Sequence, residues 1–102
     1  MITEEKARVL DVYDLAKEIV LSEVSLWRQN IWMIQKVNPE KLKKLMGFLS
    51  LEGGPRGIRI YAMETSCIPK HFLRNAAEDR DPEIRKRARE LLRGEKKPEF
   101  KV

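Results

Sequence analysis

Cys67 and His71 are the side chains of this sequence best suited to chemistry, since they are its single cysteine and its single histidine. A thiol beside an imidazole can act as a nucleophile, but Pro69 stands between the two and Cys67 falls in an expected turn. A zinc site would need further ligands at close spacing. We therefore expect a partly buried thiol and a surface imidazole, and we predict no catalytic residue, no metal site and no bound cofactor.

Two other patterns could bind ions or move protons. Asp11 and Asp14 lie three residues apart on one helical face beside Lys17, but an acid–base or metal site would need further partners. The glycine-rich segment 53–57 opens a helix, as phosphate-binding loops do. It lacks the Gly-Lys-Ser/Thr ending and the preceding strand of such a loop. We interpret it as a turn between helices, so the sequence predicts that the protein is not an enzyme.

The two tryptophans point to binding instead. Trp27 and Trp32 are five residues apart, which places them roughly 140° apart around a helix. One is expected in the core and the other at the margin or in an interface, where exposed aromatic side chains are enriched. The alternative, that both pack in the core, stays open. The candidate residues for a protein interface are Trp27, Arg28, Ile31 and Trp32.

The whole chain has a formal net charge of +5, and its basic residues concentrate in the second half. Residues 1–35 carry six acidic and four basic residues, whereas residues 81–102 carry five acidic and eight basic ones. Because a basic face can bind phosphates, a nucleic-acid interface is the alternative function. Interspersed glutamates also allow pairs within a helix, such as Glu83 with Arg87, and no DNA- or RNA-binding motif is present. The candidate residues are Arg85, Lys86, Arg89, Arg93, Lys96 and Lys97.

A helical stripe of apolar residues runs through the first third of the chain. Its steps of three and four residues predict helix, and one unbroken helix over residues 3–36 would be about 50 Å long. Either the helix breaks near residues 22–25, or it stays long and pairs with a second copy through residues 9–34 as a coiled coil. Both alternatives stay open. The stripe consists of Val9, Tyr13, Ala16, Val20, Val24, Trp27, Ile31 and Ile34.

The later helices are marked by capping residues and prolines. Asn38-Pro39 and Asp81-Pro82 each combine an N-cap with a proline at the first helical position. Further helices are expected after Pro55 and over residues 70–79, and no useful length of sequence alternates with period two. We predict an all-α fold of five or six helices, with a single domain over residues 1–94 and a flexible polar tail over residues 95–102.

An internal echo links two of these helices. Residues 57–64 and 83–90 share Ile, Arg, Ala and Glu at four of eight positions, at an offset of 26 residues. The segment 81–92 resembles the second helix of a HEAT repeat, with its Asp-Pro start, aliphatic-Arg pair, small residue and closing aliphatic pair. Over residues 38–93 the resemblance implies two stacked helical pairs, and the alternative is a small helical bundle in which two helices look alike by chance.

The resemblance also implies roles for the shared arginines. In HEAT repeats the corresponding arginine often pairs with an acidic group of the adjacent repeat, so Arg59 and Arg85 would be structural, with Asp81 or Glu52 as partners. Residues 55–59 also resemble a stretch in a small archaeal family of helical proteins of uncharacterised activity, which implies fold and lineage only.

Composition limits the location and the class of function. Charged residues make up 36% of the chain, above the roughly 25% of an average globular protein, and this is typical of thermophiles. No signal peptide and no stretch of about 18 uncharged apolar residues is present, so we expect a cytoplasmic protein that does not enter membranes. The predicted function is a small protein-binding or assembly module, with nucleic-acid binding as the alternative.

Overall fold

The computed structural model describes residues 1–51 and 54–102, and the described residues contain seven helices and no strand. The all-α prediction is confirmed, whereas the expected count of five or six helices was too low. None of these helices is long and apolar enough to cross a bilayer. The helices are α1 (Glu4–Val9), α2 (Val12–Leu21), α3 (Val24–Val37), α4 (Pro39–Ser50), α5 (Arg56–Met63), α6 (Lys70–Ala76) and α7 (Pro82–Arg93).

The extra helix arises because the N-terminal stripe breaks twice. The break expected near residues 22–25 is present at Ser22, whose hydroxyl donates to the carbonyl of Ile19 at 2.7 Å, and α3 starts at Val24. A second break, which we did not expect, lies at Leu10. There Asp11 caps α2, since its Oδ1 accepts the backbone N–H of Asp14 at 2.9 Å. The unbroken coiled-coil helix is therefore excluded.

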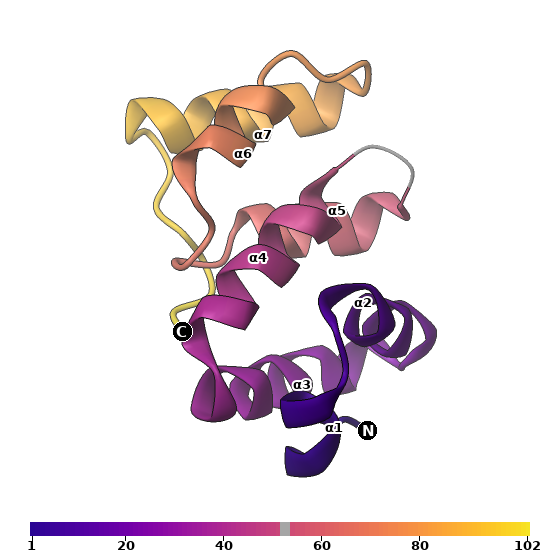
Figure 1. The fold of residues 1–102 in the computed structure, drawn as a ribbon. Coiled ribbons are helices and arrows are strands. Elements are labelled where there is room, and N and C mark those ends of the chain that lie inside the picture. Colours follow the sequence, from indigo (N-terminus) through magenta and orange to yellow (C-terminus); the bar gives the residue numbers. More distant parts are fainter. Residues whose placement is uncertain (52–53) are drawn as a thin grey trace.

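The helices form three layers, with α6 and α7 above α4 and α5, and α1, α2 and α3 below (Figure 1). The central element is α4, which packs against α2, α3, α5 and α6, while α5 also contacts α7. The pair α4–α5 is thus stacked on the pair α6–α7. The HEAT resemblance itself stays a prediction.

The hydrophobic core runs along α4 and requires one glycine there. A Cβ atom on Gly47 would lie 2.2 Å from Cε2 of Phe72. Because atoms cannot approach so closely, the missing side chain lets the Phe72 ring of α6 lie against α4. The largest fully buried apolar side chains are Ile2, Leu15, Ile19, Ile31, Ile34, Leu42, Leu45, Met46, Ile58, Met63 and Ile84.

A buried ion pair joins the two stacked pairs. Arg59 of α5 is 6% exposed, forms an ion pair with Asp79, and donates from Nε to the carbonyl of Ser50 at 3.1 Å. Nη1 of Arg85 donates to the backbone carbonyl of Asp79 at 2.9 Å. The two echoed arginines therefore meet at Asp79, which takes the place that the resemblance suggested for Asp81 or Glu52. Glu52 lies outside the described residues.

Asp81 instead organises the start of α7. One carboxylate oxygen accepts the backbone N–H of Glu83 at 3.0 Å, and the other lies 2.7 Å from Nε of Arg56. The same carboxylate thus serves as N-cap, as the sequence predicted, and holds an exposed arginine from the neighbouring pair.

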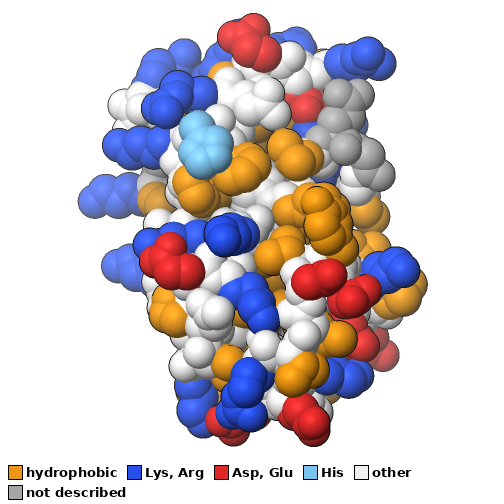
Figure 2. Space-filling model, viewed as in Figure 1, with side chains coloured by type: hydrophobic (Ala, Val, Ile, Leu, Met, Phe, Trp, Pro, Cys, Tyr) orange, Lys and Arg blue, Asp and Glu red, His pale blue; other side chains and the backbone are white. Residues whose placement is uncertain are grey.

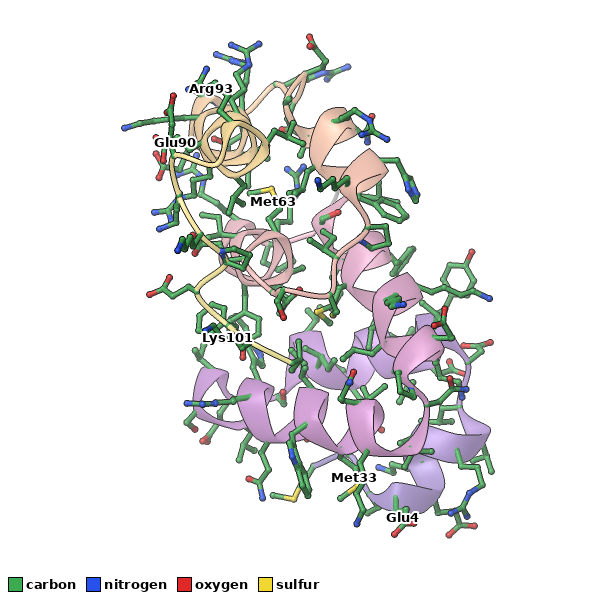
Figure 3. All side chains as sticks on the ribbon, turned by 90° about the vertical axis from the view of Figure 1, so that its left-hand side faces the viewer. Glu4, Met33, Met63, Glu90, Arg93 and Lys101 are labelled. Carbon is green, nitrogen blue, oxygen red and sulfur yellow. The ribbon has the colours of Figure 1, made fainter. Side chains whose placement is uncertain are left out.

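The C-terminal segment has a defined path in the structure, although the sequence led us to expect a flexible tail. It leaves α7 at Gly94, runs back past α5 and ends towards α3, with Lys101 near its end (Figure 3). Phe100 of this segment forms an isolated parallel bridge with Thr65. We refer to residues 95–102 as the strap.

Candidate protein-binding surfaces

The structure separates the two tryptophans, as their angular spacing predicted. Trp27 is half-buried, donates from Nε1 to the carbonyl of Ile19 at 3.0 Å, and meets the Tyr61 ring edge-on at a centroid distance of 5.4 Å. Ile31 is 1% exposed and belongs to the core. These two residues hold the fold together, so Ile31 drops out of the candidate interface.

Trp32 and Arg28 are left on the surface. The Trp32 side chain is 56% exposed, and it lines a shallow hollow of about 360 Å³ together with Arg28, Ser25 and Gln29. Nζ of Lys36 lies 5.7 Å from the centroid of the Trp32 ring, within the range of a cation–π contact. This surface is small and largely polar around a single aromatic ring.

A larger apolar surface lies on α2, which sequence analysis placed within the self-association region but did not single out. Tyr13 is 65% exposed and Leu21 is 85% exposed. Beside them lies a groove of about 660 Å³ between α2, the end of α4 and the start of α5. We call it the apolar groove, and its lining residues are Tyr13, Ala16, Lys17, Val20, Leu21, Phe48, Leu49, Leu51, Gly54, Pro55 and Ile58.

The groove exists because α2 is apolar on two sides. Leu15, Ala16 and Ile19 face the core, whereas Tyr13 and Leu21 face outward. Tyr13 meets the ring of Phe48 edge-on, with centroids 4.9 Å apart, and so continues the groove onto α4. Figure 2 shows apolar side chains gathered in the middle of the molecule, with most basic side chains around them.

The arginines proposed to bind nucleic acid mostly serve the fold. Arg85 donates to the carbonyl of Asp79 at 2.9 Å, and Nε of Arg89 donates to the carbonyl of Ala77 at 3.1 Å. Both side chains thus hold the turn between α6 and α7. These donors are committed to backbone oxygens, which weakens the case for Arg85 and Arg89 as phosphate ligands.

The other four basic candidates differ in their surroundings. Arg93 pairs with Glu95 at 2.9 Å. Lys96 lies 3.0 Å from the buried carboxylate of Glu64. The predicted pair of Glu83 with Arg87 is also present, at 2.8 Å. Lys86 and Lys97 are exposed.

Cys67 and His71, the two side chains best suited to chemistry, lie in different surroundings. Cys67 is half-buried, and this burial raises the pKa of its thiol, which disfavours the nucleophilic thiolate. His71 is exposed, with its ring 4.3 Å from that of Phe72. Within residues 1–51 and 54–102, no three His, Cys, Asp or Glu side chains lie close enough to hold a metal ion.

The two arginines beside the glycine-rich turn are already paired. Arg56 contacts Asp81, and Arg59 contacts Asp79. The anion site that the turn could have formed at the start of α5 therefore loses its two nearest cations. Gly53 lies outside the described residues.

Comparison with known proteins gives no matching family model, no similar curated protein and no similar solved structure.

Proposed function

We propose that this chain is a protein-binding and assembly module without catalytic activity, and that it associates with a second copy through the apolar groove. The observation that carries the proposal is the outward face of α2, where Leu21 and Tyr13 are both mostly exposed beside the groove. Large exposed apolar patches on small domains usually mark interaction sites, because they gain free energy when a partner removes them from water.

The shape of this surface favours a second copy as the partner. The exposed side chains of α2 form a ridge, and the groove lies directly beside it. Two antiparallel copies of α2 that cross near Lys17 would set Tyr13 of each copy opposite Leu21 of the other. Each ridge would then enter the other copy's groove, which is the self-complementary arrangement of a two-fold dimer.

The helix dipoles agree with this arrangement, because the dipoles of two antiparallel α2 helices would oppose each other, which is favourable. Arg56 is exposed just beyond Pro55 of the groove lining, but it is paired with Asp81 of its own chain and adds no free cation to the contact.

A non-catalytic role is supported by the state of the reactive groups. The thiol of Cys67 has a raised pKa, and Asp11, the first member of the carboxylate pair, acts as an N-cap. The nucleic-acid alternative has less support, because Arg85 and Arg89 are engaged with backbone carbonyls and Arg93 with a carboxylate.

Sedimentation equilibrium tests the proposal. We expect the wild-type chain to form dimers and the Leu21→Glu chain to be monomeric with an unchanged circular dichroism spectrum, because Leu21 contributes little to the core. Trp32→Glu is the matched control, since it places the same charge on the other exposed aromatic surface and should leave the dimer intact. A wild-type chain that stays monomeric at about 1 mM, or a Leu21→Glu chain that still dimerises, contradicts the proposal.

A further inference from the structure

The strap pairs with the chain segment that follows α5 through an isolated parallel bridge between Thr65 and Phe100. The backbone N–H of Phe100 donates to the carbonyl of Glu64 at 3.0 Å, and the N–H of Ser66 donates to the carbonyl of Phe100 at 2.8 Å. The N–H of Val102 also donates to Oγ of Ser66 at 3.0 Å. Since main-chain hydrogen bonds of this kind do not depend on side-chain identity, the segment can accept other extended peptides.

An aromatic platform receives the strap's side chain. The ring of Phe100 stacks on that of Tyr61, with centroids 4.1 Å apart and an interplanar angle of 23°. Tyr61 is supported from behind by the edge-on contact with Trp27. A preformed pair of aromatic rings therefore selects an aromatic side chain at this position.

A buried carboxylate selects a cation four residues earlier. Glu64 is only 2% exposed, and Nη1 of Arg87 lies 3.6 Å from its Oε2. Nζ of Lys96 lies 3.0 Å from Oε1 as an ion pair, although the contact lacks the alignment of a hydrogen bond. Without a basic residue here, the buried carboxylate would keep only the longer contact with Arg87. Because a buried charge with incomplete pairing is unfavourable, this position discriminates against a peptide without a basic residue.

The strap does not fill the site that it occupies. A hollow of about 320 Å³ remains beside Phe100, lined on the protein side by Arg28, Ile31, Tyr61 and Thr65. A larger aromatic side chain in place of Phe100 would bury more apolar surface there than the strap does.

We infer that residues 61–66 form a peptide-binding edge that the strap occupies within the same chain. Its ligand is an extended segment of another protein, with Lys or Arg four residues before Tyr or Trp. A tethered segment competes at an effective concentration of the order of mM. The partner segment prevails by filling the hollow that the strap leaves, so the strap acts as a weak occupant that limits access.

Peptides that correspond to residues 94–102 test this inference on the full chain. We expect a fluorescent peptide with this sequence to bind the Phe100→Ala chain about tenfold or more tightly than the wild-type chain, because the variant strap competes less well. The Phe100→Trp peptide should bind more tightly than the parent peptide. The Lys96→Ala and Phe100→Ala peptides should each bind about tenfold or more weakly, which corresponds to about 1.4 kcal/mol.

Two controls keep the outcome clear. Lys96→Ala loosens the strap while it leaves residues 61–66 unchanged, and it replaces the Phe100→Ala chain if that variant loses helical content. The Leu21→Glu chain should bind the peptides as the wild type does, because the apolar groove and this edge share no residue. Failure of the dimer test therefore leaves this inference unaffected.

Three results would overturn the inference. One is the absence of peptide binding to both loosened chains at about 1 mM while their circular dichroism spectra stay helical. Another is equal affinity for the parent and Lys96→Ala peptides. The third is wild-type dimerisation that Phe100→Ala abolishes while no free peptide binds, since the strap would then be exchanged between two copies of the chain.

Discussion

The α1–α3 layer and the two stacked pairs α4–α7 differ in which side chains they bury and which they expose. Within the stacked pairs and the turns between them, charged groups turn inward, with Arg59, Asp79 and Glu64 buried and paired. The α1–α3 layer turns large apolar side chains outward. Of the exposed large hydrophobic residues in the described chain, seven lie within residues 1–37 and only Leu92 and Val102 lie later.

This difference teaches where function should be sought. The echoed arginines are conspicuous in the sequence, but their guanidinium groups hold helices together and are not available as ligands. Tyr13, Val20 and Leu21 of α2 look like core in the sequence, yet they are exposed and add little to the stability of the monomer. Self-association is therefore expected at the apolar layer, and cooperative stability at the polar one.

Among the substitutions that test this contrast, Arg59→Ala is expected to lower the free energy of unfolding the most. The change leaves the Asp79 carboxylate buried without its cation and removes the donor to the Ser50 carbonyl. Loss of one partner of a buried pair costs about 3–5 kcal/mol, a large share of a total free energy of unfolding of roughly 5–15 kcal/mol. Urea denaturation measures the loss.

Arg56→Ala provides the comparison for Arg59→Ala. Arg56 belongs to the same helix and also pairs with a carboxylate, but its side chain is 63% exposed. An exposed pair contributes about 1 kcal/mol or less. Equal losses for the two variants would show that the buried pair has no special role, and the contrast between the two layers would fail.

Gly47→Ala is expected to lower the free energy of unfolding by a smaller amount, about 1–3 kcal/mol. The new Cβ would lie 2.2 Å from the Phe72 ring, so this ring, or α6 with it, must shift away from α4. Gly57→Ala is the matched control, because its Cβ would meet only the Trp27 ring, at 3.8 Å. That change should stabilise the chain by up to about 1 kcal/mol through helix propensity, and thermal unfolding should therefore move in opposite directions for the two variants.

Local signals in the sequence predicted most helix boundaries but not all. Asn38-Pro39 and Asp81-Pro82 start α4 and α7 as expected, because capping depends on neighbouring residues alone. The break at Leu10 is not predicted because the apolar stripe continues through it, although Asp11 is a residue type that favours the N-cap position. An isolated glycine within a helix, such as Gly47, often has a packing reason, and this signal was available.

Contacts between distant residues account for the rest. The angular spacing of Trp27 and Trp32 predicted that one of them packs on the core and the other lies near the surface. It could not show that Ile31 is buried as well. The groove depends on where α4 and α5 lie against α2, and no local pattern contains that information. The strap was expected to be flexible because its composition is polar, yet Phe100 finds Tyr61 nearly 40 residues away in the sequence.

Acid is expected to weaken the stacked pairs before it weakens the apolar layer. The ion pair with Arg59 lowers the pKa of Asp79 below its ordinary 3.8, and contacts with Arg56 and Arg87 lower the pKa values of Asp81 and Glu83. Because the fold favours the ionised carboxylates, their contribution is complete above the ordinary pKa values. It is lost as the pH falls through the lower pKa values of the folded state.

Amide hydrogen exchange at pH 7 and near pH 3 would check this expectation. The loss of stability in acid should be smaller than the loss caused by Arg59→Ala, because the protonated carboxyl group of Asp79 can still accept a hydrogen bond. Asp79→Asn should be less stable at neutral pH and should show a weaker dependence on acid. If α2 and α3 lose protection before α7 does, acid sensitivity is not a property of the polar layer.

The smallest effect is expected from Lys41→Met, which concerns a long-range polar anchor of α1. Nζ of Lys41 donates to the carbonyls of Ala7, Arg8 and Leu10 at 2.9–3.1 Å, so an ammonium group from α4 caps the end of α1. A cation at a helix C-terminus contributes about 0.3–1 kcal/mol. Methionine keeps the apolar stem and removes only the charge and its donors.

The loss should be local, with faster exchange of the α1 amides and little change in the global unfolding midpoint. Lys43→Met is the control, since Lys43 lies on the same helix and pairs only with the exposed Glu40. If Lys41→Met lowered the hydrogen-exchange protection of α7 as much as that of α1, the two layers would unfold as one unit. In that case the contrast between them would describe their surfaces but not their stability, because α4 would couple both layers through its contacts with α2, α3, α5 and α6.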